Sequence, residues 1–181
     1  MYTFLIKFGF FILSIAIIMV YYNQQITEIK NTIAIEINTT NMNKIDEVFK
    51  DLKFLEFHSA VKKIEFIEQI KKEEKLIDIY EITEEAKVLG GLYNFYSKNK
   101  INVHKINSHN FLTNIRMKIM GFFNIEFNTE FIAFLNENKN GIIIEERKNI
   151  KGPSLLVPIV AKVADDFHTI MFKKMKDAIE K

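Results

Sequence analysis

The sequence predicts an α+β protein in which a run of antiparallel strands is followed by one long C-terminal helix. Hydrophobic residues alternate with a period of two through most of residues 32–146, and the period changes to 3.6 after Gly152. An apolar N-terminal segment predicts a membrane anchor ahead of this domain. The chain has 181 residues, and those left after the anchor and a spacer suffice for one domain with a core, but not comfortably for two.

The N-terminal segment is apolar from Phe4 to Tyr22, with Lys7 as its only charge. A membrane-spanning helix needs about 20 mostly apolar residues, and a lysine near its end can extend its charge to the headgroups. We therefore expect an uncleaved single-pass anchor over residues 1–22. A cleaved signal peptide is the alternative, and it is disfavoured because the one small-x-small triplet, residues 14–16, would leave a very short apolar core.

The predicted anchor determines the expected domain organisation and localisation of the chain. Residues 23–31 are expected to form a spacer and residues 32–181 the domain. Basic residues differ only slightly between the two flanks of the anchor, and we expect the N-terminus inside and the domain on the outer face of the cytoplasmic membrane. The lipid bilayer is thus one expected partner, and another envelope protein is a second.

The first part of the domain is expected to be a strand followed by short helices. Residues 32–38 place three isoleucines on one face, which predicts a half-buried strand. Cap-type residues at 40–43 then precede apolar residues at helical spacing up to Leu52, and residues 54–58 can add a second short helix.

The middle of the chain is expected to be a meander of antiparallel strands. Residues 64–67 and 77–80 are predicted to form a hairpin around a charged turn at 71–75. Further strands are expected at 92–96, 101–106, 111–120, 123–135 and 142–146, with Asn, Ser, Lys or Gly turns between them.

Apolar residues at helical spacing predict a C-terminal helix that could run from Pro153 to Glu180, about 40 Å long. Asp165 and Asp166 fall in its first half and three lysines near its end, as the helix dipole favours. Such a helix would cross a whole sheet.

Two stretches carry a resemblance to a known family. Residues 57–66, Phe-His-Ser-Ala-Val-Lys-Lys-Ile-Glu-Phe, look like a turn into a second strand, and residues 140–147 and 151–158 look like a last strand and the entry to a long helix. Together with the order of elements, they resemble the START-like, or SRPBCC, superfamily. The resemblance implies a helix-grip fold, in which a curved antiparallel sheet wraps the C-terminal helix and leaves a cavity for a hydrophobic ligand such as a lipid, sterol, quinone or polyketide.

The resemblance also implies which residues line that cavity. The candidates lie on the apolar stripe of the long helix: Leu156, Ile159, Val160, Val163 and Phe167. A solid core gives the same sequence pattern as an open cavity, and these residues are core residues before they are ligand-binding ones.

Composition excludes several classes of function. The chain has no cysteine, which removes disulfides, thiolate catalysis and cysteine-bound metals. Its formal charge of +2 is spread evenly, so nucleic acid is not an expected partner. The four histidines lack metal-binding spacing, and no phosphate-binding, dinucleotide-binding or hydrolase motif occurs. We expect no metal, no cofactor and no catalytic residue.

Four polar features are candidates for chemistry. His168 on the long helix could line the cavity, but we expect it at the rim or surface, and Arg116 could pair with a ligand headgroup, but we expect it on a solvated strand face. The adjacent acidic pairs at 145–146 and 165–166 diverge in direction, so neither is a natural carboxylate dyad.

Three functions remain open from the sequence. The leading hypothesis is a membrane-anchored domain that binds a hydrophobic ligand. The alternative is a structural or interaction module of the cell envelope with a solid core, and the third is an enzyme of the cyclase or dehydratase kind.

Overall fold

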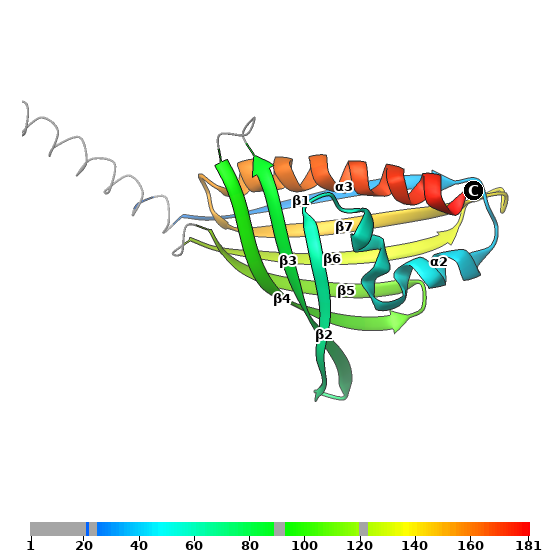
Figure 1. Cartoon of the computed structure of the whole chain (residues 1–181), viewed down its shortest axis with the longest axis horizontal. Helices are drawn as coiled ribbons and strands as arrows, with labels where there is room; N and C mark the ends of the chain where they lie inside the picture. Colours follow the sequence, from blue (N-terminus) through cyan, green and yellow to red (C-terminus); the bar gives the residue numbers. More distant parts are fainter. Residues whose placement is uncertain (1–20, 22–24, 89–92, 120–122) are drawn as a thin grey trace, which may run out of the picture.

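Alternating Ile, Phe and polar residues give long strands that pair into one antiparallel sheet. The computed structural model describes residue 21 and residues 25–88, 93–119 and 123–181 (Figure 1). Within this part of the chain the sheet has seven strands. They are β1 (Ile26–Ile37), β2 (Val61–Lys72), β3 (Lys75–Val88), β4 (Tyr93–Asn107), β5 (Asn110–Ile119), β6 (Phe123–Leu135) and β7 (Ile142–Pro153).

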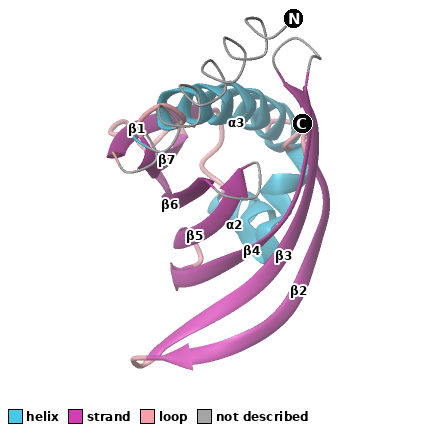
Figure 2. Ribbon diagram, turned by 90° about the vertical axis from the view of Figure 1, so that its left-hand side faces the viewer, coloured by secondary structure: helices cyan, strands magenta, loops and turns pink. Residues whose placement is uncertain are grey.

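The strand order is β1-β7-β6-β5-β4-β3-β2, so each strand from β2 to β7 pairs with its sequence neighbour and β1 closes the sheet against β7. Figure 2 shows the sheet curving around one long helix, α3 (Val157–Ile179). The face toward α3 is called the inner face below. The sheet and helix form the grip that was predicted from the sequence.

A short helix pair connects β1 to β2. Helix α2 (Met42–Phe49) begins where the Asn41 side chain accepts a hydrogen bond from the backbone N–H of Asn43. The 3₁₀ helix η1 (Lys50–Phe57) follows and contains a kink at two residues with positive φ, Asp51 and Leu52. Ile45 and Phe49 are buried, and the pair closes the end of the grip near the C-terminus of α3 (Figure 1).

Helix α3 begins later than the sequence predicts. Pro153, the expected first residue, instead pairs with Ile26 at the end of β7, and a turn separates it from the helix. Pro158 lies in the first turn of α3, where a missing N–H costs nothing. The 23 residues of α3 make it about 35 Å long.

Two other strand boundaries differ from the prediction. Strand β1 begins at Ile26, so residues 26–31 of the expected spacer belong to the sheet. The strands expected at 92–96 and 101–106 are one strand, β4, because the Ser97 and Asn99 region continues the pairing with β3 and is not a turn. The charged hairpin, the strand at 123–135 and the turn that follows it are confirmed.

The buried core consists of two apolar clusters along α3. The C-terminal cluster joins α2, η1 and several strands to Met171, Phe172, Met175 and Ile179 of α3. The N-terminal cluster is smaller, and its buried members are Ile125, Ile150, Val157 and Ala161. A polar region lies between the two.

The predicted anchor over residues 1–22 lies outside the described residues, except for Tyr21. Within the described ranges, no helix is both long enough and apolar enough to cross a bilayer.

Candidate functional site

Strand β7 places two charged side chains inside the grip. Its inner face carries Ile142, Ile144, Glu146, Lys148 and Ile150, so the charges occupy two positions of an apolar series. Glu146 is 0% exposed and Lys148 2% exposed. Buried charges of this kind need partners, because desolvation of an unpaired ion is costly.

The partners come from α3. The Lys148 Nζ lies 3.2 Å from Glu146 Oε2 and 2.8 Å from Asp165 Oδ1. His168 Nδ1 lies 2.6 Å from Glu146 Oε1, one helical turn further along. The Asn31 side chain of β1 donates a hydrogen bond to the second oxygen of Asp165. These five residues are called the polar cluster below.

The charges of the cluster compensate one another. Burial alone would raise the pKa of Glu146, but the neighbouring His168 and Lys148 outweigh it and hold that pKa below its ordinary value. Glu146 is therefore a carboxylate between two nitrogen groups, and Lys148 is shared by two carboxylates.

His58 lies beside the cluster, in the turn that leads into β2. It is 6% exposed, and its ring centroid lies 5.2 Å from that of Phe167 and 5.3 Å from that of His168. Burial, followed by the charge of His168, lowers the pKa of His58 to about 3, so its ring is neutral at physiological pH. Its Nδ1 is buried and has no hydrogen-bond partner among the described residues.

A second polar group approaches the same region from β3 and β4. The Ser97 hydroxyl donates a hydrogen bond to Glu84 Oε2 at 3.0 Å, and the Asn99 amide donates to the Ser97 oxygen at 2.9 Å. Burial raises the pKa of Glu84 despite this hydrogen bond and the charge of His168. Its carboxyl thus favours the neutral form more than an exposed glutamate does.

The polar cluster separates the two apolar clusters of the core. Thr113, Thr129, Lys148 and Asn31 lie directly opposite one another on four adjacent strands, and they continue the polar zone across the inner face. The Thr113 hydroxyl donates weakly to the Thr129 carbonyl, at 3.5 Å. The arrangement can orient one polar group of a molecule that is otherwise surrounded by apolar side chains.

The predicted cavity-lining residues lie on one flank and the outside of α3. Leu156 and Val160 pack against the N-terminal apolar cluster, and Phe167 contacts His58. Val163 is partly buried on the same flank, whereas Ile159 is half exposed. Their role in binding stays a prediction.

The expectations for the charged residues have different outcomes. His168 is partly buried, with its side chain 20% exposed, and it contacts Glu146, so it lies at the rim of the polar cluster and not on the open surface. Arg116 is exposed on the outer face and lies 3.5 Å from Glu126, as expected. The acidic pairs do diverge, with Glu145 and Asp166 facing outward.

The sequence reasoning missed that one member of each acidic pair meets the other across the fold. Glu146 and Asp165 are both bound by Lys148. The alternation of residues in β7 could have indicated the two charges on this strand. Ile142 and Ile144 face inward, and every second residue after them, Glu146 and then Lys148, must face the same way. No group of three or more acidic or histidine side chains in the described ranges is arranged to hold a metal ion.

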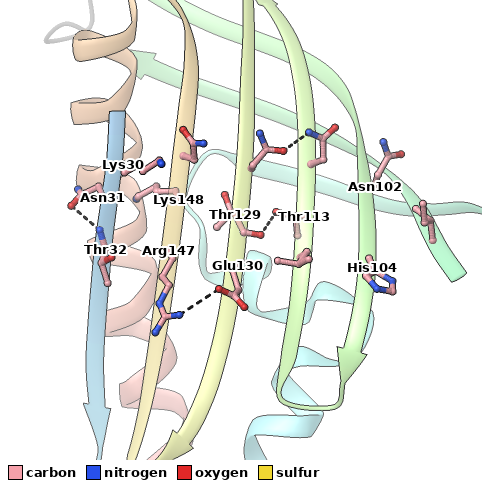
Figure 3. Close-up of a pocket in the computed structure, with 15 residues that line it drawn as sticks. Lys30, Asn31, Thr32, Asn102, His104, Thr113, Thr129, Glu130, Arg147 and Lys148 are labelled. Atoms are coloured by element: carbon pink, nitrogen blue, oxygen red, sulfur yellow. Dashed lines mark hydrogen bonds and ion pairs between the residues drawn. The ribbon is translucent and has the colours of Figure 1, made fainter. Parts of the chain in front are cut away.

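The outer face of the sheet carries two open hollows. The larger, about 610 Å³, crosses six strands, and its lining is mostly polar apart from Ile77 and Leu112 (Figure 3). Asn102, Asn114, Asn128 and Asn149 lie opposite one another along it, and an Arg147–Glu130 pair at 3.6 Å lies beside this row. The smaller hollow, about 530 Å³, lies near the start of β1 and contains Arg116, Lys118 and Lys151. The lining of the larger hollow also includes Asn31 and Lys148, which belong to the polar cluster, so the hollow and the cluster lie on either side of the same part of the sheet.

Fold and site together define a helix-grip domain, which is the fold that the resemblance to the START-like, or SRPBCC, superfamily implies. The chain is similar in structure to the Zhui aromatase/cyclase from Streptomyces sp. R1128, with a TM-score of 0.61, 8% identity and coverage of 86% of this chain and 94% of that one. It is also similar to Ara h 8.0201, with a TM-score of 0.53, 14% identity and coverage of 86% and 98%. At such identities the likeness shows the fold alone.

Another match is longer than this chain. The di-domain ARO/CYC BexL from the BE-7585A biosynthetic pathway matches 84% of this chain with a TM-score of 0.57 and 7% identity. This chain spans only 49% of the length of that protein. No family model matches the sequence, and no curated protein matches it.

Proposed function

We propose that this domain binds a hydrophobic small molecule inside the grip and fixes one polar group of that molecule at His58 and the polar cluster. The observation that carries the proposal is a buried neutral histidine whose Nδ1 has no partner, beside a set of buried, paired charges. Buried polar groups in proteins are normally hydrogen-bonded, so a free buried nitrogen is a natural contact for a ligand. The named neighbours include aromatase/cyclases of this fold, which supports an interior site.

The charges favour a neutral polar group on the ligand. Glu146 and Asp165 already share Lys148, and Glu84 lies nearby with a raised pKa. An anionic headgroup would add negative charge beside carboxylates that already share Lys148, whereas a hydroxyl or carbonyl can hydrogen-bond to the neutral His58 ring. The proposed ligand class is therefore an apolar molecule with a hydroxyl or carbonyl group.

The apolar part of the ligand would lie along the flank of α3. Leu156, Val160, Val163 and Phe167 are partly buried there, between the N-terminal apolar cluster and His58. Partly buried apolar side chains next to a polar cluster are the usual lining of a small-molecule site. The predicted anchor would keep this site next to the bilayer, as a single-pass protein with the domain on the outer face of the cytoplasmic membrane.

The proposal is tested on full-length chain purified in mild detergent and transferred to an amphipathic polymer. Native mass spectrometry and organic extraction should reveal a bound apolar molecule. In a parallel titration, a fluorescent apolar probe should be displaced by a long-chain alcohol more readily than by the alkane of equal length. Displacement by neither compound, with no co-purified molecule, would exclude the site and favour the structural or interaction module with a solid core.

A second candidate function is proton transfer to a ligand held in the same place, as in a cyclase or dehydratase. The observation that favours it is the contact of 2.6 Å between His168 and Glu146, because a histidine oriented by a carboxylate is a common general base. His168→Gln should then abolish turnover of a bound polyketide-like substrate and leave binding intact. Arg116→Gln, on the outer face, is the matched control and should leave turnover unchanged.

A further inference from the structure

The start of the described domain is fixed at one end of the grip. The backbone N–H of Ser154 donates a hydrogen bond of 2.8 Å to the carbonyl of Gln25, just before β1 and just before α3. The predicted anchor ends at Tyr22, so only two residues lie between its end and Gln25. The three residue steps from Tyr22 to Gln25 span about 10 Å when extended. An anchored chain would therefore hold this end of the domain against the bilayer.

The same end carries exposed apolar side chains. Ile26 at the start of β1, Leu155 before α3 and Ile159 in its first turns are each about half exposed or more. Figure 1 shows that the start of β1, the end of β7 and the start of α3 lie together, opposite the C-terminus. Apolar side chains next to a chain that leaves for a membrane are suited to the interface.

The smaller outer hollow adds positive charge at this end. Its lining includes Ile26, Arg116, Lys118 and Lys151, with Glu126 as its one acidic residue. Glu126 pairs with Arg116 at 3.5 Å. Glu28 lies opposite Lys151 in the sheet, but its carboxylate contacts Lys30 at 3.3 Å. Lys118 and Lys151 form no ion pair with the described residues, so both charges are available to an anion.

We propose that this end of the domain docks on anionic lipid headgroups, with Lys118 and Lys151 toward the phosphates and Leu155 and Ile159 at the interface. The partner is the surface of an anionic bilayer, and the inference rests on the anchor that forms part of the proposed function. Docking would fix the direction of α3, with its N-terminus at the membrane and its C-terminus away from it. The flank of α3 proposed to hold the ligand then begins at the bilayer surface.

The test uses the full chain reconstituted into vesicles, and it exploits the absence of cysteine. A fluorophore is attached to Leu155→Cys at the proposed docking end, or to Asn138→Cys in the turn at the far end of the grip. The vesicles contain phosphatidylcholine with phosphatidylglycerol, or phosphatidylcholine alone, and a lipid with a quencher in its headgroup. Docking predicts strong quenching at residue 155, background quenching at residue 138, and loss of the quenching at residue 155 in high salt.

Charge removal gives the matched control. Each lysine near an anionic surface changes the binding constant by roughly fivefold, so Lys118→Gln with Lys151→Gln should lower the docked population ratio by roughly 25-fold. Lys71→Gln with Lys72→Gln, on the exposed β2–β3 hairpin, removes the same charge and should leave quenching unchanged.

Two outcomes overturn the inference and identify the reason. A chain that floats with the vesicles but shows equal quenching at residues 155 and 138 has an anchor without the docked orientation. A chain that does not float with either vesicle has no anchor, and this result would contradict both the anchor and the docking. The ligand site is measured separately by probe displacement, and its failure leaves the quenching result unaffected.

Discussion

Two regions of the interior pack against the same helix in different ways. Around the C-terminal half of α3, aromatic rings from α2, η1, β5 and β6 contact one another with centroids 4.8–5.8 Å apart, and the side chains are apolar. One turn toward the N-terminus of α3, the inner face instead carries Glu146, Lys148 and their partners. The comparison shows that the inward-facing residues of the same strands can form a solid apolar core at one end of the grip and a polar site beside it.

The apolar region should show the largest effect on stability. Phe54 is buried and its ring lies 4.8 Å from that of Phe131. Phe54→Ala should lower the free energy of unfolding by about 3–5 kcal/mol, because it leaves a cavity between packed rings. Urea denaturation measures the loss. Phe66→Ala, on β2 and 57% exposed, should lower the free energy of unfolding by about 1 kcal/mol or less. Equal losses in the two variants would contradict the solid packing around Phe54.

The polar cluster should respond more strongly to the loss of one partner than to the loss of all its charges. Lys148→Met removes the lysine that Glu146 and Asp165 share, which leaves the buried Glu146 with His168 alone and Asp165 with Asn31 alone, and should cost about 3 kcal/mol at neutral pH. Adding Glu146→Gln and Asp165→Asn should restore part of this stability. Lys162→Met, which removes an exposed pair with Asp166, is the control and should cost less than about 1 kcal/mol. If the polar cluster contributes nothing to stability, Lys148→Met and Lys162→Met should have the same free energy of unfolding.

The buried histidine should make stability fall as the pH is lowered. His58 in the unfolded chain takes up a proton below pH 6.5, whereas in the folded protein its pKa is lowered to about 3. Between these values the unfolded state binds the extra proton, so acid favours unfolding. We expect a loss of about 2 kcal/mol from pH 6.5 to 4.5 that is smaller in His58→Gln. Parallel curves for the two proteins would show that His58 is protonated in the fold.

Substitutions on the half-buried flank of α3 should have the smallest effects. They should change ligand affinity more than stability. Phe167→Ala removes a ring beside His58 and should weaken binding of a fluorescent apolar probe about tenfold, which corresponds to the partial burial of an aromatic side chain. Ile170→Ala, exposed on the same helix, should leave the affinity unchanged. The same affinity in both variants would place the probe elsewhere.

The sequence predicts the strands and the long helix because both have clear periods, whereas the wrapping of the sheet around the helix is implied by the resemblance alone. The alternation around Phe127 and Phe131 and the helical spacing from Val157 to Ile179 reproduce β6 and α3 closely. The merged strand β4 could not be predicted, because Ser97 and Asn99 have turn-forming side chains and only pairing with β3 keeps them extended.

The polar cluster was hidden for a different reason. Its members come from β1, β7 and α3, and the partners Asn31 and Asp165 are far apart in sequence. Neighbouring residues gave no dyad, since adjacent side chains point to opposite faces of a strand. Only the tertiary pairing of strand and helix brings Lys148 between two carboxylates.

The central claim is that the interior binds an apolar molecule through a neutral polar group. The most direct measurement compares three compounds of equal chain length, an alcohol, a carboxylic acid and an alkane, in displacing a fluorescent probe from the full chain at neutral pH. The account predicts that the alcohol binds most tightly and that His58→Ala removes its advantage over the alkane, because His58 is the neutral hydrogen-bonding group beside the polar cluster. Equal displacement by the alcohol and the alkane, or tightest binding of the acid, would contradict it.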